Sequence, residues 1–151
     1  MSVETANKSD ANSARKVRVM QIGLSFLAVD DDQLLAVVGF VEPTPLPFAP
    51  PSVLGVVSIE GKMFTVLETT GAPQNRKQLA ALRGDEQLAI AIDDCAAPIE
   101  IDEQIIYQGQ GDAAVFSSAS FRDGEREIPL LDVSKLFSGL LQGRERRRRR
   151  F

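Results

Sequence analysis

The sequence predicts an all-β fold that ends in one amphipathic helix. Short apolar segments recur along the chain, and turn signals such as Glu60-Gly61 and Asp123-Gly124 separate them. Many short strands at such spacing favour a barrel or a sandwich over a sheet built from βαβ units. With 151 residues, the chain has the length of one domain with its own hydrophobic core.

The first strand is expected at residues 19–29, VMQIGLSFLAV, because apolar residues from Met20 to Phe26 alternate with small or polar ones. This period of two is typical of a half-buried strand. An acidic turn, DDDQ at residues 30–33, then leads to LLAVVGFV, which is expected to be the partner strand.

A proline-rich connector follows, with five prolines from Pro43 to Pro51. Each proline fixes its own φ and pushes the preceding residue toward an extended conformation, which predicts a semi-rigid segment. The segment leads into a hairpin made of VLGVVSI and KMFTVLE, with Glu60-Gly61 at its turn. We expect Gly55 and Gly61 to have conformational roles, in a close approach of two segments or at a positive φ.

The second half of the chain continues with strand signals. The stretch GAPQNRKQLAALRGD, residues 71–85, is expected to contain a short helix. The next segment, EQLAIAID, is expected to be a strand with its leucine and isoleucines on one face and its alanines on the other. Further strand signals in PIEI, QIIYQ and AVFSSASF precede a hairpin at Asp123-Gly124.

The last predicted element is the amphipathic helix. Asp132 is a suitable N-cap, and Gly143 stands where a C-cap glycine is expected. The apolar residues are spaced by three and four positions, which places them on one face: Val133, Leu136, Phe137, Leu140 and Leu141.

The composition argues against catalysis. The chain has no histidine, which removes the usual general base, and Cys95 is its one cysteine, so no intramolecular disulfide and no CxxC zinc site can form. No Ser-x-x-Lys motif lies near the serines at 117, 118 and 120, and no glycine-rich phosphate loop is present. We therefore expect a non-enzymatic protein without a cofactor or a metal.

Two acidic clusters could suggest other chemistry. Asp30, Asp31 and Asp32 are consecutive, so their carboxylates should point in different directions, and a solvated turn is a better interpretation than a cation site. Asp93-Asp94 follows a predicted strand and could be a carboxylate pair, but no nearby residue supplies a catalytic partner.

The ends of the chain differ from its middle. Residues 1–16 are small and polar, so we expect them to be disordered. They lack the apolar core of a signal peptide, and no apolar run approaches the ~20 residues of a membrane span. The sequence therefore predicts a cytoplasmic protein.

A strongly basic tail at residues 144–151 follows an acidic body. Its arginines could bind a polyanion, either nucleic acid or an anionic membrane, with an affinity that falls steeply with salt. The acidic body would repel the same polyanions, so a solvated tail, or one that lies on its own body, is the other interpretation. The residues concerned are Arg144, Arg146, Arg147, Arg148, Arg149 and Arg150.

At residues 45–61, PLPFAPPSVLGVVSIEG resembles the CheW-like domain of bacterial chemosensory signalling. The similarity extends to LSFLAVDDDQLLAVVGFVEP, which is similar to the opening hairpin of that family, and to GKMFTVLE, LAIAIDDCAAPIEI and DGEREIPLLDVSKLF. It covers roughly residues 20–142. The resemblance implies two intertwined five-stranded SH3-like β-barrels with a C-terminal amphipathic helix, in one domain at residues 17–143.

The resemblance also implies a function. Members of the family bridge chemoreceptor tips to the regulatory domain of the CheA histidine kinase, and they use no cofactor. Two positions depart from the family pattern: Glu60 stands where an arginine is common, and Phe40 stands where an acid is common. These departures indicate a divergent adaptor, in an alternative chemosensory or twitching-motility pathway.

Five residues are candidates for partner contact. Two of them, Phe40 and Glu60, occupy the altered positions, and the other three border the proline-rich connector: Leu46, Phe48 and Val53. For Leu46 and Val53, plain core packing is the alternative, and a barrel strand could also bury Phe40.

Overall fold

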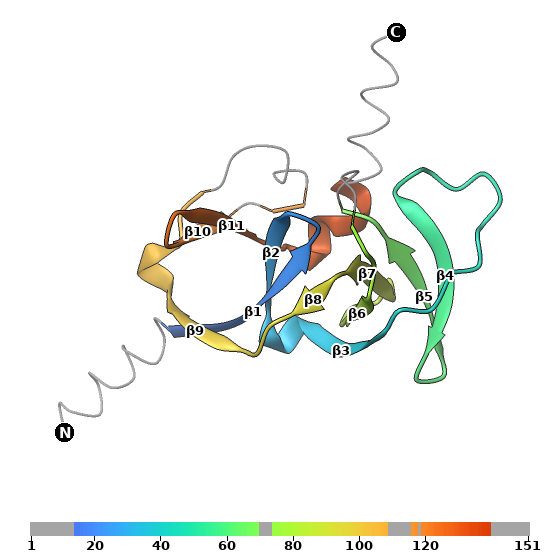
Figure 1. Ribbon diagram of the computed structural model, residues 1–151, viewed down its shortest axis with the longest axis horizontal. Coiled ribbons are helices and arrows are strands. Elements are labelled where there is room, and N and C mark those ends of the chain that lie inside the picture. Colours follow the sequence, from blue (N-terminus) through green and yellow to red (C-terminus); the bar gives the residue numbers. More distant parts are fainter. Residues whose placement is uncertain (1–13, 70–73, 109–115, 118, 140–151) are drawn as a thin grey trace, which may run out of the picture.

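A computed structural model describes residues 14–69, 74–108, 116–117 and 119–139. Within these ranges, eleven strands form two sheets, and each sheet curves into a barrel. The two barrels lie side by side along the longest axis of the molecule (Figure 1). The predicted all-β fold with two barrels is confirmed.

The first barrel is a six-stranded sheet with the order β10-β11-β2-β1-β8, and β9 also pairs with β1. Its strands are β1 (Ala14–Ile22), β2 (Ser25–Asp30), β8 (Asp94–Cys95), β9 (Ile99–Asp102), β10 (Ala119–Asp123) and β11 (Arg126–Leu130). β8 and β9 pair with successive parts of β1, so together they fill one edge position. This is why the sheet has six strands where five were expected.

The second barrel is a five-stranded sheet with the order β3-β6-β7-β5-β4. Its strands are β3 (Leu34–Gly39), β4 (Val53–Ile59), β5 (Lys62–Leu67), β6 (Gln78–Leu82) and β7 (Leu88–Ile92). A bridge between Thr44 and Val56 brings the chain after β3 alongside β4. The barrel thereby closes, which leaves few unpaired backbone groups at its edge.

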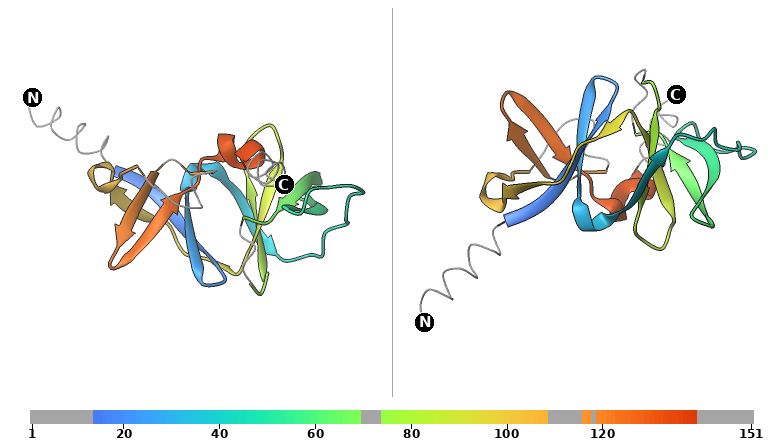
Figure 2. Two further views of the ribbon diagram at one scale, coloured as in Figure 1. Left: turned by 90° about the horizontal axis from the view of Figure 1, so that it is seen from above. Right: turned by 60° about the horizontal axis from the view of Figure 1, so that its bottom comes forward.

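The two barrels are interlocked along the chain. The chain contributes β1 and β2 to the first barrel, builds all of the second barrel with β3 to β7, and returns to the first barrel at β8. Figure 2 shows this crossing from two further directions. The barrels therefore form one domain whose first and last strands share a sheet.

Three hydrophobic clusters hold the domain together. One fills the first barrel around Phe121 and Ile128, and one fills the second barrel around Phe64 and Leu79. The largest cluster lies between the barrels, because it combines buried residues of β1 and β2 with residues of β6 and β7, such as Ile90.

Strand β7 shows how the sequence pattern produces this arrangement. All five of its residues are buried. The leucine and isoleucines pack between the barrels, and the small alanines point into the second barrel, where little space is available. The predicted two-faced strand is therefore confirmed, with both faces covered by protein.

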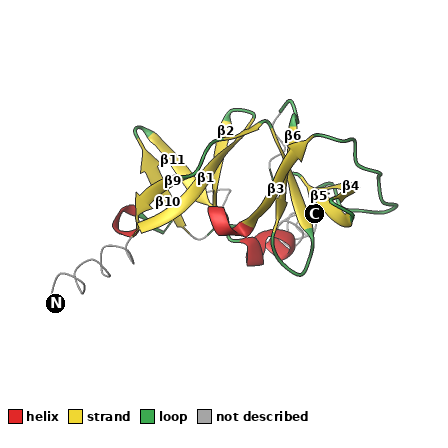
Figure 3. Ribbon diagram, turned by 90° about the horizontal axis from the view of Figure 1, so that it is seen from below, coloured by secondary structure: helices red, strands yellow, loops and turns green. Residues whose placement is uncertain are grey.

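The C-terminal helix covers the junction between the barrels (Figure 3). It runs over residues 133–139, and the Oδ1 atom of Asp132 accepts a hydrogen bond of 3.1 Å from the backbone N–H of Ser134. Leu136 is fully buried in the central cluster. The predicted cap and helix start are confirmed; Leu140, Leu141 and Gly143 lie outside the described residues.

The first predicted strand is wrong, because residues 14–30 form a hairpin. Ile22 pairs with Ser25, Gly23 has a φ of 63°, and Leu24 at the tip is 96% exposed. Apolar residues continue on both sides of Gly23, so the alternation passes through the turn without a strong turn signal.

The expected pairing of the next strand is also wrong. A 3-10 helix, η1 (Asp31–Gln33), carries the chain from the first sheet to the second, so β3 pairs with β6 and not with β2. The expected helix at residues 71–85 is not observed in its described part, which contains strand β6. Tertiary pairing here overrides a composition that favours helix.

Two further expectations are corrected. Residues 14–16 were expected to be disordered, but they belong to β1 and pair with β9; residues 1–13 lie outside the described part. QIIYQ was expected to be a strand, but η2 (Glu103–Ile105) occupies its first part, and Tyr107 makes only an isolated bridge to Ser120.

Candidate docking surface

The proline-rich connector is a loop that is held firmly at both ends. At its start, Thr44 and Val56 exchange two backbone hydrogen bonds of 2.9 Å. At its end, Val53 donates its N–H to the carbonyl oxygen of Pro50 at 2.9 Å, and the buried Ser52 accepts a backbone hydrogen bond from Glu68 at 2.8 Å. Residues 45–51 project from the second barrel between these attachments (Figure 1).

Gly55 makes the first attachment possible. Its φ is 145°, and a Cβ atom at this position would lie 2.3 Å from the carbonyl oxygen of Thr44. No side chain fits at that distance, so the connector can approach β4 only over a glycine. The predicted conformational role of Gly55 is confirmed.

The tip of the loop is a tight turn that presents apolar side chains. Ala49 donates its N–H to the carbonyl oxygen of Leu46 at 3.3 Å, which closes a β-turn over residues 46–49. Leu46 is 43% exposed, and Phe48 is fully exposed with a φ of 61°. The core-packing alternative therefore does not describe Leu46.

Two of the candidate residues lie mainly inside the protein. Phe40 is half-buried against the cluster inside the second barrel, and Val53 is half-buried against the cluster between the barrels. Val53 lies at the end of the loop, and the backbone N–H of Phe40 donates a hydrogen bond of 3.0 Å to the carbonyl oxygen of Lys77. Their placement agrees with the packing alternative for Val53 and Phe40.

Glu60 lies at the tip of the β4–β5 hairpin. Glu60 and Gly61 have φ values of 51° and 82°, which is the pattern of a two-residue hairpin turn with two left-handed positions. The predicted turn and the positive φ of Gly61 are confirmed. Strand β4, about 20 Å long, separates this tip from the loop that carries Phe48. Leu46, Phe48 and Val53 therefore lie before or at the start of β4, and Glu60 lies after its end. Phe40 directly follows β3.

The whole segment from Phe40 to Gly61 is acidic and apolar in character. It contains Glu42 and Glu60, both exposed, and no lysine or arginine. At the loop itself, Glu42 and the exposed side chains of Leu46 and Phe48 are complementary to an apolar partner surface with a basic residue at its edge.

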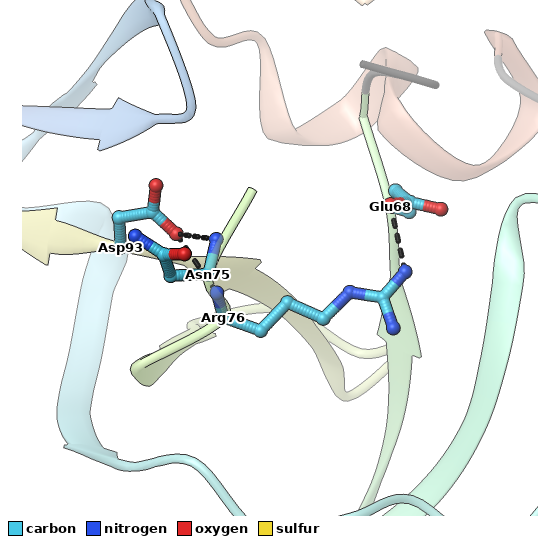
Figure 4. A network of polar contacts seen from close by, with 4 residues as sticks. All are labelled: Glu68, Asn75, Arg76 and Asp93. Carbon is cyan, nitrogen blue, oxygen red and sulfur yellow. Dashed lines mark hydrogen bonds and ion pairs between the residues drawn. The ribbon is translucent and has the colours of Figure 1, made fainter. Parts of the chain in front are cut away.

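A hydrogen-bond network that the sequence did not reveal fixes the relative positions of the barrels. One carboxylate oxygen of Asp93 accepts hydrogen bonds from the backbone N–H groups of Asn75, at 2.9 Å, and Arg76, at 2.8 Å (Figure 4). The other oxygen accepts a hydrogen bond of 2.9 Å from the backbone N–H of Gly23, in the β1–β2 turn. Asp93 thus connects a turn of the first barrel to the segment that enters β6 of the second.

The electrostatics of Asp93 follow from this geometry. Partial desolvation acts to raise the pKa of its carboxyl, but the three backbone N–H donors together outweigh it and hold the pKa below its ordinary value. The Arg76 guanidinium also contacts Glu68 at 2.9 Å, at the end of β5. The carboxylate of Asp93 therefore has a structural role.

The comparisons with known proteins identify the family. The family model of the CheW-like domain matches residues 17–140. The chain belongs to the CheW-like domain family. This places it among the scaffolding and adaptor domains of chemotaxis signalling. A comparison with curated proteins found no match.

A solved structure has the same fold as this CheW-like domain. The crystal structure of the scaffolding protein TtCheW from Thermoanaerobacter tengcongensis aligns with a TM-score of 0.68 and 17% sequence identity. The alignment covers 78% of this chain and 88% of that chain. At this level of identity the similarity concerns the fold.

In the acidic turn of this CheW-like domain, Asp30 forms an ion pair with Arg15. The guanidinium of Arg15 contacts both carboxylate oxygens of Asp30, at 2.6 and 2.7 Å, and this hydrogen bonding raises the pKa of Arg15. Across the described ranges, no group of three acidic or cysteine side chains is placed to hold a metal ion. The ion pair joins the start of β1 to the end of β2.

Two other predictions concern membrane spans and the basic tail. None of the described helices is both long and apolar enough to span a bilayer. The six arginines of the tail lie outside the described residues, so their role stays a prediction.

Proposed function

We propose that this CheW-like domain is a non-enzymatic adaptor in the cytoplasm. It docks the regulatory domain of a CheA-type histidine kinase, the cytoplasmic tips of chemoreceptors, or both, through protein–protein contacts and without a cofactor. The observation that carries the proposal is the anchored loop that holds Leu46 and Phe48 in solvent. Exposed apolar side chains on a rigid loop are suited to binding a protein surface.

The second end of β4 supports a divergent role. An acid at the tip of the β4–β5 hairpin, Glu60, would repel any carboxylate that an arginine there would bind. Phe40 fills part of the second barrel. A partner of this domain must therefore accept an acidic hairpin tip, which favours an alternative chemosensory or twitching-motility pathway.

The direct test uses purified components. The full chain is titrated by calorimetry with the regulatory domain of a CheA-type kinase and, separately, with a receptor-tip fragment from the same organism. We expect saturable 1:1 binding to at least one of them. Leu46→Asp should weaken it by about tenfold or more, since a carboxylate would replace an apolar contact, whereas Lys135→Ala on the exposed face of the helix should not. No binding to either protein would contradict the proposal.

A second candidate function rests on the charge of the tail. The six arginines within residues 144–151 could bind a polyanion independently of the barrels. In that case affinity for single-stranded nucleic acid or anionic vesicles should fall steeply with salt and disappear in a chain that ends at Gly143. Equal binding by the shortened chain would exclude this function.

A further inference from the structure

Phe48 combines full exposure with a backbone conformation that strongly favours glycine or asparagine. It is the third residue of the turn over residues 46–49, Pro47 is the second, and the φ of Phe48 is 61°. Proline followed by a residue with positive φ is the pattern of a type II turn. An aromatic residue at this position strains the backbone, because its Cβ crowds the neighbouring carbonyl oxygen.

Within the described residues, no packing of the Phe48 side chain offsets this strain. The ring is fully exposed, so it buries no apolar surface against the described part of the protein. Single exposed apolar residues are common on protein surfaces. Residues in sparsely populated backbone conformations cluster at functional sites, so an exposed aromatic residue in such a conformation is a candidate for binding.

We propose that Phe48 is an aromatic anchor that inserts into an apolar pocket on the protein partner of this domain. The inference rests on the proposed adaptor function and specifies the contact that makes the binding selective. The prolines at positions 45, 47, 50 and 51 restrict the loop before binding, so little conformational entropy is lost when the partner immobilises it. Aromatic anchors in desolvated pockets supply much of the energy of protein interfaces.

The charge around the loop specifies the edge of that pocket. Glu42, which is exposed, precedes the loop, and residues 43–59 contain no charged residue. The partner pocket is therefore apolar at its centre and carries lysine or arginine at its rim. The same charge disfavours insertion of Phe48 into an anionic membrane.

The first experiment separates binding from folding with two substitutions of Phe48. Phe48→Asn places a residue that tolerates a left-handed φ, and Phe48→Tyr keeps the ring. Thermal unfolding should give an unchanged or higher Tm for Phe48→Asn, and calorimetry with the purified kinase regulatory domain or receptor tip should show at least tenfold weaker binding. Phe48→Tyr should bind within about threefold of the wild type.

Several results would overturn the inference. Wild-type affinity in Phe48→Asn, beside normal binding by the unchanged chain, would overturn it and leave the adaptor function standing. A lower Tm for Phe48→Asn would show that the ring has a structural role. If the wild type binds neither purified partner, the adaptor function and this inference fail together.

A second experiment tests the stated chemistry of the partner. Glu42→Lys should weaken binding severalfold at low salt and less at high salt, because the basic rim would then face a like charge. Sedimentation velocity tests whether Phe48 binds a second copy of this chain, and vesicles of phosphatidylglycerol test whether it binds an anionic membrane. Self-association or vesicle binding that Phe48→Asn abolishes, while partner binding stays unchanged, would overturn the proposal.

Discussion

Gly55 lies so close to Thr44 that a Cβ atom at position 55 would be 2.3 Å from the Thr44 carbonyl oxygen. This contact lets the proline-rich connector pair with β4, which closes the second barrel and fixes the base of the loop that carries Phe48. The backbone at one glycine thus determines both the closure of a barrel and the position of the candidate docking surface.

Gly55→Ala should therefore be strongly destabilising. The new methyl group collides with backbone, and the φ of 145° is strained for any L side chain. We expect a loss of about 2 kcal/mol or more in the free energy of unfolding, measured by urea titration. The matched control is Gly39→Ala in β3, where a Cβ meets nothing within 4 Å. Equal stability of the two variants would contradict the close approach.

Asp93→Ala should loosen the contact between the barrels. Three backbone N–H groups lose their acceptor, which we expect to cost about 1–2 kcal/mol at neutral pH. Asp94→Ala, at the exposed neighbouring position, is the control and should change stability by less than about 0.5 kcal/mol. A smaller loss for Asp93→Ala than for Asp94→Ala would refute the role of the network.

The contribution of Asp93 should depend on pH in a defined direction. Because its pKa is lower in the folded chain than the ordinary 3.8, its contribution is fully present above pH 3.8 and is lost as the pH falls through the lower, folded value. The difference in unfolding free energy between wild type and Asp93→Ala should therefore be constant near neutral pH and shrink below pH 3.8. A difference that grows on acidification would show the opposite sign of the pKa shift.

Leu136→Ala should weaken the packing of the helix against the junction between the barrels. Leu136 is fully buried in the central cluster, so its truncation leaves a cavity and should cost about 2–4 kcal/mol. Lys135→Ala, on the exposed face of the same helix, should cost little. Comparable Tm values for the two variants would show that the helix does not stabilise the domain.

Cys95 should react slowly with alkylating reagents. Burial raises the pKa of its thiol, so less thiolate is present near neutral pH. We expect alkylation by iodoacetamide at pH 8 to be roughly tenfold slower in the folded chain than in urea. Equal rates in both states would indicate a more accessible cysteine than the structure shows.

Turn residues and apolar alternation predicted the hairpins and the strand faces, which depend on residues that are close in sequence. The hairpins at Glu60-Gly61 and Asp123-Gly124 each contain a glycine at positive φ, Gly61 and Gly124, and both hairpins are observed. The alternation in β7 was also sufficient to assign its two faces. The turn at Gly23 was missed because Leu24 continues the apolar pattern although it points into solvent.

Long-range pairing could not be derived from local patterns. β3 follows β2 directly, yet η1 moves it to the other sheet, where its partner is β6. The parallel pairs β5–β7 and β2–β11 likewise join segments that are distant in sequence. Such pairs depend on the packing of the whole domain, which only the family resemblance indicated.

The candidate site was predicted in part. The proline-rich stretch was predicted from composition, because prolines fix the backbone wherever they occur. The exposure of Leu46 was not, since an apolar residue there could equally pack in the core. The role of Asp93 was not found, since its partners are backbone N–H groups of Gly23, Asn75 and Arg76, and any residue type could supply them. The distance between Glu60 and the loop also follows from the length of β4 and not from sequence proximity.

Hydrogen–deuterium exchange of the chain, alone and saturated with the kinase regulatory domain or the receptor tip, tests the docking surface most directly. The account predicts slower exchange in peptides that cover residues 44–54 on addition of the partner, and no change in β9 and β10 of the first barrel. Protection confined to the first barrel, or unchanged exchange at residues 44–54 in a saturated complex, would contradict docking through this loop.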